Sequence, residues 1–451
     1  SKRVRQIHSV KDPHAPMDKI LLSVFTDGTG NDAIQASSTG TRSNVAKLFA
    51  MWDDTRSKNL FRAKHYVVGV GTAGGLDTLV GGFTGAGFRD RVDEAMRWIW
   101  ETSLRFPLAA IDVQLFGFSR GAAEAMHLVN LLNDPDDLAK YGLTGRKVRV
   151  VFAGLFDPVA SLGLPGNGID PGARLNLHPS QVDVVVSLVA QAEVRALFDL
   201  QSIRLAPPGH DGSVSVTGGD WQTLWKSCPL PTEKWEEWLM PGVHSDVGGG
   251  YEPEEWIPDL PVLPPENGES VSGYIYRMKN RELNFGAAPR GVTGNDFRSR
   301  ENIQDRVKSI YDEKMKAWTQ KRNEELAGNH QVTLGEADRE HPVLPALRVR
   351  DNSLSLVSLW FMIRRSEKAG VKWKTIGQLD ESTRSVVARL PNAHPLYALQ
   401  MQDLSPADFE NELRLSNDRF WNLVVPCIHD SRLATDLAQR DREVYFCGRK
   451  D

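Results

Sequence analysis

The segment Val113-Gln114-Leu115-Phe116-Gly117-Phe118-Ser119-Arg120-Gly121-Ala122-Ala123 joins a short apolar run to a stretch with helical periodicity. A serine between two glycines at such a junction predicts a tight turn from a strand into a helix. Glycine is needed on both sides because the backbone is strained there and neighbouring chains approach closely. Ser119 is therefore a candidate nucleophile on a nucleophile elbow. The structural alternative is a serine that only caps the following helix.

Short apolar runs and helix-period segments alternate along the chain outside this turn. This alternation predicts an α/β fold of the α/β-hydrolase-like kind, with a mostly parallel sheet flanked by helices. Because ligands of such sheets bind at the carboxyl ends of the strands, we expect the site there. The predicted strands are Ile20 to Phe25, His65 to Val70, Val113 to Phe116 and Val148 to Phe152, and Arg89 to Leu104 is a predicted helix.

Length, charge and cysteine content exclude several classes of protein. The 451 residues carry 54 Lys and Arg against 58 Asp and Glu, so the net charge of −4 argues against a nucleic-acid binder. The three cysteines form no CxxC pair, which indicates neither a disulfide scaffold nor a zinc ribbon. The given sequence has no apolar run of about 18 residues, and its start lacks the apolar region of a Sec signal peptide.

A serine hydroxyl needs a general base, and the base needs an orienting acid. Asp157 follows the predicted strand Val148 to Phe152, where the acid of an α/β-hydrolase belongs in chain order. Asp170 is a competing acid, but it lies in a Gly- and Pro-rich loop without a strand to orient it. An aspartate that only starts a turn before Pro158 is the structural alternative.

The candidate base is His244, which lies in the glycine-rich stretch Pro241 to Tyr251. Glycines there would let an imidazole approach a serine without obstruction. His429 is the alternative base, because in many hydrolases of this fold the base follows the last strand. His127 lies on the predicted elbow helix facing away from the turn, and we interpret it as a packed histidine.

Acyl transfer also needs donors to the oxyanion that forms on the substrate. The backbone N–H of Arg120, which follows the nucleophile, is the first candidate. The glycine-rich loop Phe25 to Asn31 is the natural source of the second, with Gly28 or Thr29 as the donor and Asp27 as a brace of the loop. This chemistry requires no metal and no cofactor.

Two motifs that would indicate other functions match the sequence only in part. Asp27-Gly28-Thr29 resembles the DxDGT motif of haloacid-dehalogenase-type phosphatases, but Phe25 stands where the attacking aspartate would be. Gly69 to Gly74 matches GxGxxG, yet no helix opens there and no acidic residue ends a following strand, so dinucleotide binding is not indicated.

The periodicity is lost after Tyr251, which predicts an insertion. It contains one predicted helix, Asp305 to Ala327, and a second predicted helix, Ser353 to Ala369, returns to the core. The predicted division is a flexible tail at 1–18, a catalytic domain at 19–255 plus 351–451, and an insertion at 256–350 that serves as a lid, a membrane contact or a docking module.

Five of the twelve tryptophans fall around His244 in the sequence. Core packing is the favoured interpretation, and contact with a bilayer is the alternative. They are Trp221, Trp225, Trp235, Trp238 and Trp256.

Four ordered motifs, FTDGTGN at 25–31, GFSRGAA at 117–123, GLFDPVAS at 154–161 and PGVHSDVGGGY at 241–251, carry a resemblance to a known family. Together they resemble the antibacterial phospholipase effectors of type VI secretion, specifically their first lipase family, whose catalytic domain is an α/β-hydrolase. The resemblance covers about residues 19–255. The sequence departs from the family pattern at Thr26, where Phe is more common, and at Pro158, where Thr is frequent.

The resemblance implies that Ser119, Asp157 and His244 form the catalytic triad. It further implies hydrolysis of acyl esters of membrane glycerophospholipids in the periplasm of a rival bacterium, delivery on the secretion spike, and neutralisation in the producer by an immunity protein. A soluble carboxylesterase or thioesterase with the same three residues is the alternative function. A non-catalytic binding protein with this fold is a third possibility.

Overall fold

The computed structural model describes residues 17–28, 31–32, 42–57, 59–69, 85–159, 172–193, 195, 198–207, 221–251, 254–258, 263–269, 347–389, 404–412 and 444–447, with isolated positions between 274 and 320 and between 424 and 428. The predicted tail at 1–18 lies almost wholly outside them.

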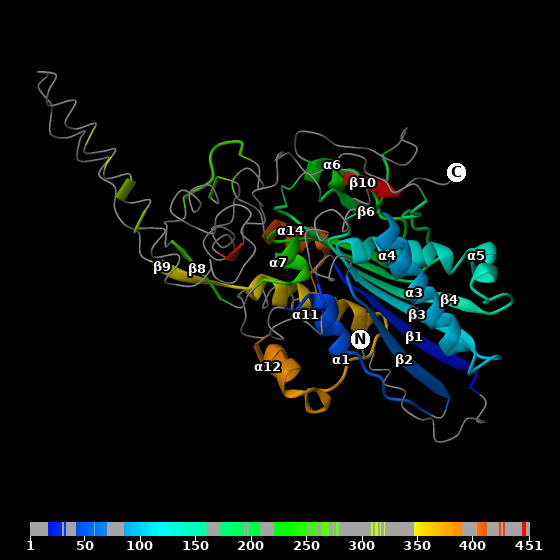
Figure 1. Ribbon diagram of the computed structural model, residues 1–451. Helices are drawn as coiled ribbons and strands as arrows, with labels where there is room; N and C mark the ends of the chain where they lie inside the picture. Colours follow the sequence, from blue (N-terminus) through cyan, green and yellow to red (C-terminus); the bar gives the residue numbers. More distant parts are fainter. Residues whose placement is uncertain are drawn as a thin grey trace, which may run out of the picture.

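The centre of the protein is a six-stranded sheet in which every neighbouring pair is parallel (Figure 1). The strands lie in the order β2-β1-β3-β4-β5-β7, so their carboxyl ends share one edge. This agrees with the predicted α/β class. Their bounds are β1 Lys19–Thr26, β2 Leu60–Val67, β3 Ala110–Phe118, β4 Val148–Phe156, β5 Val185–Ala190 and β7 Trp235–Met240.

Helices cover both faces of this sheet (Figure 1). Alternate residues of a strand point to opposite faces, so Ile20, Leu22 and Val24 join the core under α3 and α4, whereas Leu21 and Phe25 join the core under α1 and α11. The helices are α1 Asn44–Met51, α3 Gly85–Ser103, α4 Arg120–Leu131, α5 Pro135–Lys140, α6 Trp221–Ser227, α7 His244–Gly248, α11 Ser353–Lys368, α12 Glu381–Arg389 and α14 Pro406–Glu412, with the short 3₁₀ helix η5 at Ile376–Gln378.

Strand β2 begins five residues before its predicted start at His65. The prediction was wrong there because charged side chains interrupt the apolar run. On this edge strand they have their own partners: Arg62 pairs with Asp53 at 2.8 Å, and Lys64 donates to the Phe49 carbonyl at 2.6 Å. The charged side chains of this strand are therefore accommodated by partners of their own.

Two strands lie at the ends of the segment predicted as an insertion. β8 (Glu254–Pro258) pairs antiparallel with β9 (Leu347–Asp351), and Pro258 lies opposite Leu347. Helix α11 follows β9 and packs into the core, as predicted for Ser353 to Ala369. Most of the predicted helix from 305 to 327 lies outside the described residues. A further pair, β6 (Leu200–Leu205) with β10 (Val444–Cys447), forms a small separate sheet.

Candidate active site

Ser119 directly follows β3 and stands at the N-cap position of α4 with φ 59° and ψ −125°. Its hydroxyl makes no capping hydrogen bond with the helix, which argues against the purely structural alternative. The flanking glycines have no room for a side chain. A Cβ on Gly117 would lie 2.5 Å from the Ala122 Cα, and one on Gly121 would lie 2.3 Å from the Thr26 carbonyl oxygen. The strand, turn and helix thus have the geometry of a nucleophile elbow.

Asp157 occupies the corresponding place after the neighbouring strand β4. It is completely buried and has a positive φ of 41°. Its Oδ1 accepts a hydrogen bond from the Ala190 N–H at 2.8 Å, and its Oδ2 lies 2.7 Å from Nδ1 of His244. An aspartate that only started a turn before Pro158 would have no need of these contacts. Asp170 lies outside the described residues.

His244 begins α7, just after β7 on the same edge of the sheet. His244 is 4 % exposed, and its ring packs against those of Phe118 and Phe198, at centroid distances of 4.6 and 4.8 Å. Burial lowers the pKa of His244 from its ordinary 6.5, because desolvation penalises the imidazolium more than Asp157 stabilises it. The imidazole is therefore neutral near pH 7 and can accept a proton. The alternative base His429 lies outside the described residues.

The loop after β1 is organised by the buried carboxylate of Asp27. This carboxylate accepts hydrogen bonds from the Gly28 N–H at 2.7 Å and from the hydroxyls of Ser43 and Tyr66, both at 2.5 Å. Burial raises the pKa of Asp27 to about 6 although these donors favour the ionised form. Asp27 thus has the bracing contacts expected of it. The N–H of Gly28 points to Asp27, and Thr29 lies outside the described residues.

Sequence reasoning missed a buried ion pair next to His244. Glu193 and Arg195 follow β5, and the Arg195 guanidinium binds both carboxylate oxygens of Glu193, at 2.9 and 3.0 Å. Glu193 Oε2 also accepts the backbone N–H of His244 at 3.1 Å. The sequence signal was a glutamate and an arginine two residues apart, just after an apolar run. The carboxyl ends of the strands of this sheet lie at one edge, so polar residues that follow such a run are candidates for the site.

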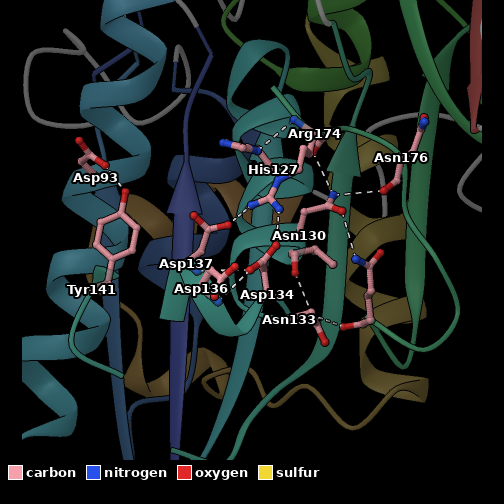
Figure 2. Close-up of polar contacts among 12 residues, drawn as sticks. Asp93, His127, Asn130, Asn133, Asp134, Asp136, Asp137, Tyr141, Arg174 and Asn176 are labelled. Atoms are coloured by element: carbon pink, nitrogen blue, oxygen red, sulfur yellow. Dashed lines mark hydrogen bonds and ion pairs between the residues drawn. The ribbon is translucent and has the colours of Figure 1, made fainter. Parts of the chain in front are cut away.

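His127 on α4 has a structural role, as interpreted from the sequence (Figure 2). Its Nδ1 accepts the Arg174 N–H at 3.1 Å, and its ring packs on Phe88. Burial lowers the pKa of His127 to about 4, so it stays neutral. The Arg174 guanidinium also pairs with Asp134 and Asp137 at the start of α5. This network fastens the chain around Arg174 to α4 and α5, away from Ser119.

Four of the five tryptophans near His244 in the sequence are core residues, with at most 2 % of their surface exposed. This contradicts the alternative that they contact a bilayer; they are Trp221, Trp225, Trp235 and Trp238. Within the described part of the chain, no helix is long and apolar enough to cross a membrane.

A parallel sheet with a serine on a strained strand-to-helix turn defines an α/β-hydrolase-type protein. The chain belongs to the family of Tle1-like phospholipase effectors of type VI secretion: the family's catalytic domain matches residues 21–140 and 136–263, which together make up more than half of the chain. Membership of this family makes the protein a hydrolase of the phospholipase effector type.

One solved structure agrees with this assignment at the level of the fold. A Tle1 effector bound to the VgrG spike of the type 6 secretion system is 21 % identical, with 95 % of this chain and 88 % of that chain covered and a TM-score of 0.51. An uncharacterised protein from Pseudomonas aeruginosa is 19 % identical over 92 % of this chain and 65 % of that one, with a TM-score of 0.35. A putative carboxylesterase from Lactobacillus plantarum WCFS1 is 13 % identical over 43 % and 69 %, with a TM-score of 0.23. No curated protein sequence matches the chain.

Proposed function

We propose that this protein is a serine-dependent phospholipase A-type hydrolase that cleaves acyl esters of membrane glycerophospholipids, with Ser119, His244 and Asp157 as its catalytic residues. The observation that supports this most is the 2.7 Å contact between His244 Nδ1 and Asp157 Oδ2, made by residues at the same sheet edge as the strained serine. The family assignment supports the choice of phospholipid as the substrate.

In the proposed reaction, the Ser119 hydroxyl attacks the ester carbonyl while Nε2 of His244 takes its proton. The Nδ1–H of the same ring donates to Asp157, which selects the reactive tautomer and stabilises the imidazolium that forms. Collapse of the tetrahedral intermediate releases the lysolipid alcohol, which takes the proton from His244. Water, deprotonated by His244, then attacks the acyl-enzyme, and the fatty acid leaves as His244 returns the proton to the Ser119 oxygen.

The oxyanion would be held by the N–H of Arg120, at the positive end of α4, and by a second N–H from the loop after β1. Gly28 and Thr29 are the candidates for this second donor. The Gly28 N–H already donates to Asp27, so Thr29 is the favoured second donor to the oxyanion. Asp27 then holds the loop in place.

We further propose the biological setting that the family suggests. The protein would leave the producing cell by the type VI route on a spike protein, since the similar Tle1 effector is bound to a VgrG spike. It would act on the membrane from the periplasm of the target cell, and an immunity protein would neutralise it in the producer. The insertion at 256–350 is a candidate lid, membrane contact or docking module in the same proposal.

Mass spectrometry of the lipids left after incubation with phospholipid vesicles tests the activity. The wild-type protein should release fatty acid and lysophospholipid, and Ser119→Ala should release neither. Ser227→Ala, which changes an exposed serine in α6, is the matched control and should behave as wild type. Turnover of soluble short-chain esters without turnover of vesicles would favour the esterase or thioesterase alternative. Equal lipid profiles for the wild type and Ser119→Ala would reject catalysis by this serine.

A further inference from the structure

The Glu193–Arg195 ion pair is almost completely removed from solvent. The side chain of Glu193 is fully buried and that of Arg195 is 9 % exposed. Burial favours the neutral acid, but the adjacent guanidinium outweighs it and lowers the pKa of Glu193 to about 2. Both members are therefore charged at neutral pH, and together they add no net charge to the core.

This pair reaches the main chain and the ring of His244 from the loop after β5. Glu193 Oε2 accepts the His244 N–H at 3.1 Å. The Arg195 guanidinium lies 3.3 Å from the centroid of the Phe198 ring, and Phe198 packs edge-on against the imidazole. The same loop is bound to the loop after β7, because the Ala192 N–H donates to the Gly242 carbonyl at 2.9 Å. The ion pair thus reaches His244 in two ways. Glu193 contacts its main chain directly, and Arg195 contacts the Phe198 ring that packs against its imidazole.

A contribution to stability explains such a pair poorly. Two buried charges lose much of their hydration, and a protein with apolar side chains of similar volume in their place is often equally stable or more stable. The charged groups around the imidazole are Asp157 from the loop after β4, and Glu193 and Arg195 from the loop after β5. Asp246 in α7 itself is bound to the Val243 N–H at 3.0 Å. Arg195 disfavours the imidazolium and Glu193 favours it, so the two members act on His244 in opposite directions, with the effect of Arg195 the larger.

We propose that Glu193 and Arg195 are positioning residues for His244: Glu193 fixes the main chain at the base, and Arg195 holds both Glu193 and Phe198 in place without leaving a net charge beside the ring. This role rests on the proposed function, in which His244 is the base. It needs no direct contact between the pair and the substrate.

Two variants separate this role from simple stabilisation. Glu193→Gln keeps an acceptor for the His244 N–H but removes the anion of the pair and leaves the guanidinium charge of Arg195 in place. The imidazolium becomes less favourable, so the midpoint of the His244 titration should move to lower pH by about one unit. In Glu193→Gln with Arg195→Met the guanidinium charge is gone as well, so the midpoint should return towards the wild-type value. In that double variant kcat should fall roughly tenfold at unchanged KM, because Phe198 and the residue-193 side chain lose their support.

The titration is followed by NMR of ¹³C-histidine-labelled protein in the Ser119→Ala background, with the His244 signal assigned by its absence in His244→Ala. This readout does not depend on turnover, so it tests the positioning role even if phospholipid hydrolysis is not found. Thermal unfolding checks that each variant is folded, and the double variant, which lacks both charges of the pair, still tests the predicted fall in kcat if Glu193→Gln is unstable.

Glu237→Gln is the matched control. Glu237 is also fully buried and paired with an arginine, Arg204 at 3.4 Å, but it lies within β7 and does not contact His244. It should lower the melting temperature without moving the His244 midpoint. The positioning role is rejected if Glu193→Gln titrates as the wild type does, or if the single and double variants shift by the same amount.

Discussion

Ser119 and Asp157 directly follow neighbouring parallel strands and share a backbone feature: both have a positive φ, 59° and 41°. No other non-glycine residue in the described part of the chain has one. Such conformations cost of the order of 1–3 kcal/mol each and persist where the surrounding structure enforces them. Two strained residues side by side at one sheet edge indicate that their side-chain positions matter more than local stability.

Strain at Ser119 predicts an order of stability among its variants. Ser119→Ala keeps a Cβ at positive φ and should unfold at nearly the wild-type urea concentration. Ser119→Gly removes that strain, so its free energy of unfolding should exceed that of Ser119→Ala by about 1 kcal/mol. Urea unfolding followed by circular dichroism measures both, and both should be inactive. A less stable Ser119→Gly would show that the turn is not strained.

Asp157→Asn should reduce kcat by roughly 10³- to 10⁴-fold with little change in KM, because the amide no longer selects the tautomer that carries a proton on Nδ1 of His244. Initial rates on phospholipid vesicles measure this effect. Asp134→Asn, at the N-cap of α5, is the control. It should cost a little stability through the lost ion pair with Arg174, because asparagine still caps the helix, while kcat stays unchanged. A loss of less than tenfold in Asp157→Asn would exclude Asp157 as the orienting acid.

The lowered pKa of His244 predicts the pH dependence of hydrolysis. A general base must be neutral, and a base with a lowered pKa stays neutral to lower pH than usual. The acid limb of kcat/KM should therefore have its midpoint below 6.5, and activity should be constant from there to neutral pH. Rates measured between pH 4 and 8 in buffers of constant ionic strength test this expectation. A midpoint above 6.5 would contradict it.

Close packing behind the elbow predicts that Gly121→Ala is severely damaging. The new Cβ would meet backbone atoms of Thr26 and Asp27, which cannot yield as a flexible side chain would. We expect a loss of about 1–3 kcal/mol in the free energy of unfolding, together with a large fall in kcat as α4 moves. Gly377→Ala, in η5, has no atom within 4 Å of the added Cβ and should be nearly neutral. Wild-type activity in Gly121→Ala would mean that the elbow is not tightly packed.

The central part of the fold was predictable because its strands are short apolar runs that end in glycine or aspartate. β1 and β3 fall where the pattern places them, and α11 ends one residue before its prediction. Residues Ser119, Asp157 and His244 were predictable because each lies in a distinctive local motif. The structure adds the contact of the last two and the shared sheet edge, and their catalytic roles remain predictions.

Other features depend on long-range contacts that a local pattern does not contain. β2 begins among charged residues. The partner of one of them, Asp53 for Arg62, is brought to it by the fold, and the apolar pattern does not reveal it. Glu193 and Arg195 look like ordinary polar loop residues until the fold places them against His244. β8 was missed because its partner, β9, lies far along the chain.

The antiparallel pairing of β8 with β9 has a consequence for how this protein can vary. Since Pro258 and Leu347 stand opposite each other, the chain leaves and re-enters at adjacent points, as at the base of a hairpin. Residues 259–346 therefore leave and rejoin the rest of the chain at neighbouring points, but they are not independent of it: Tyr274 and Met278 are buried in the same core as Phe25. A shortened or exchanged segment would have to supply side chains that fill these two places.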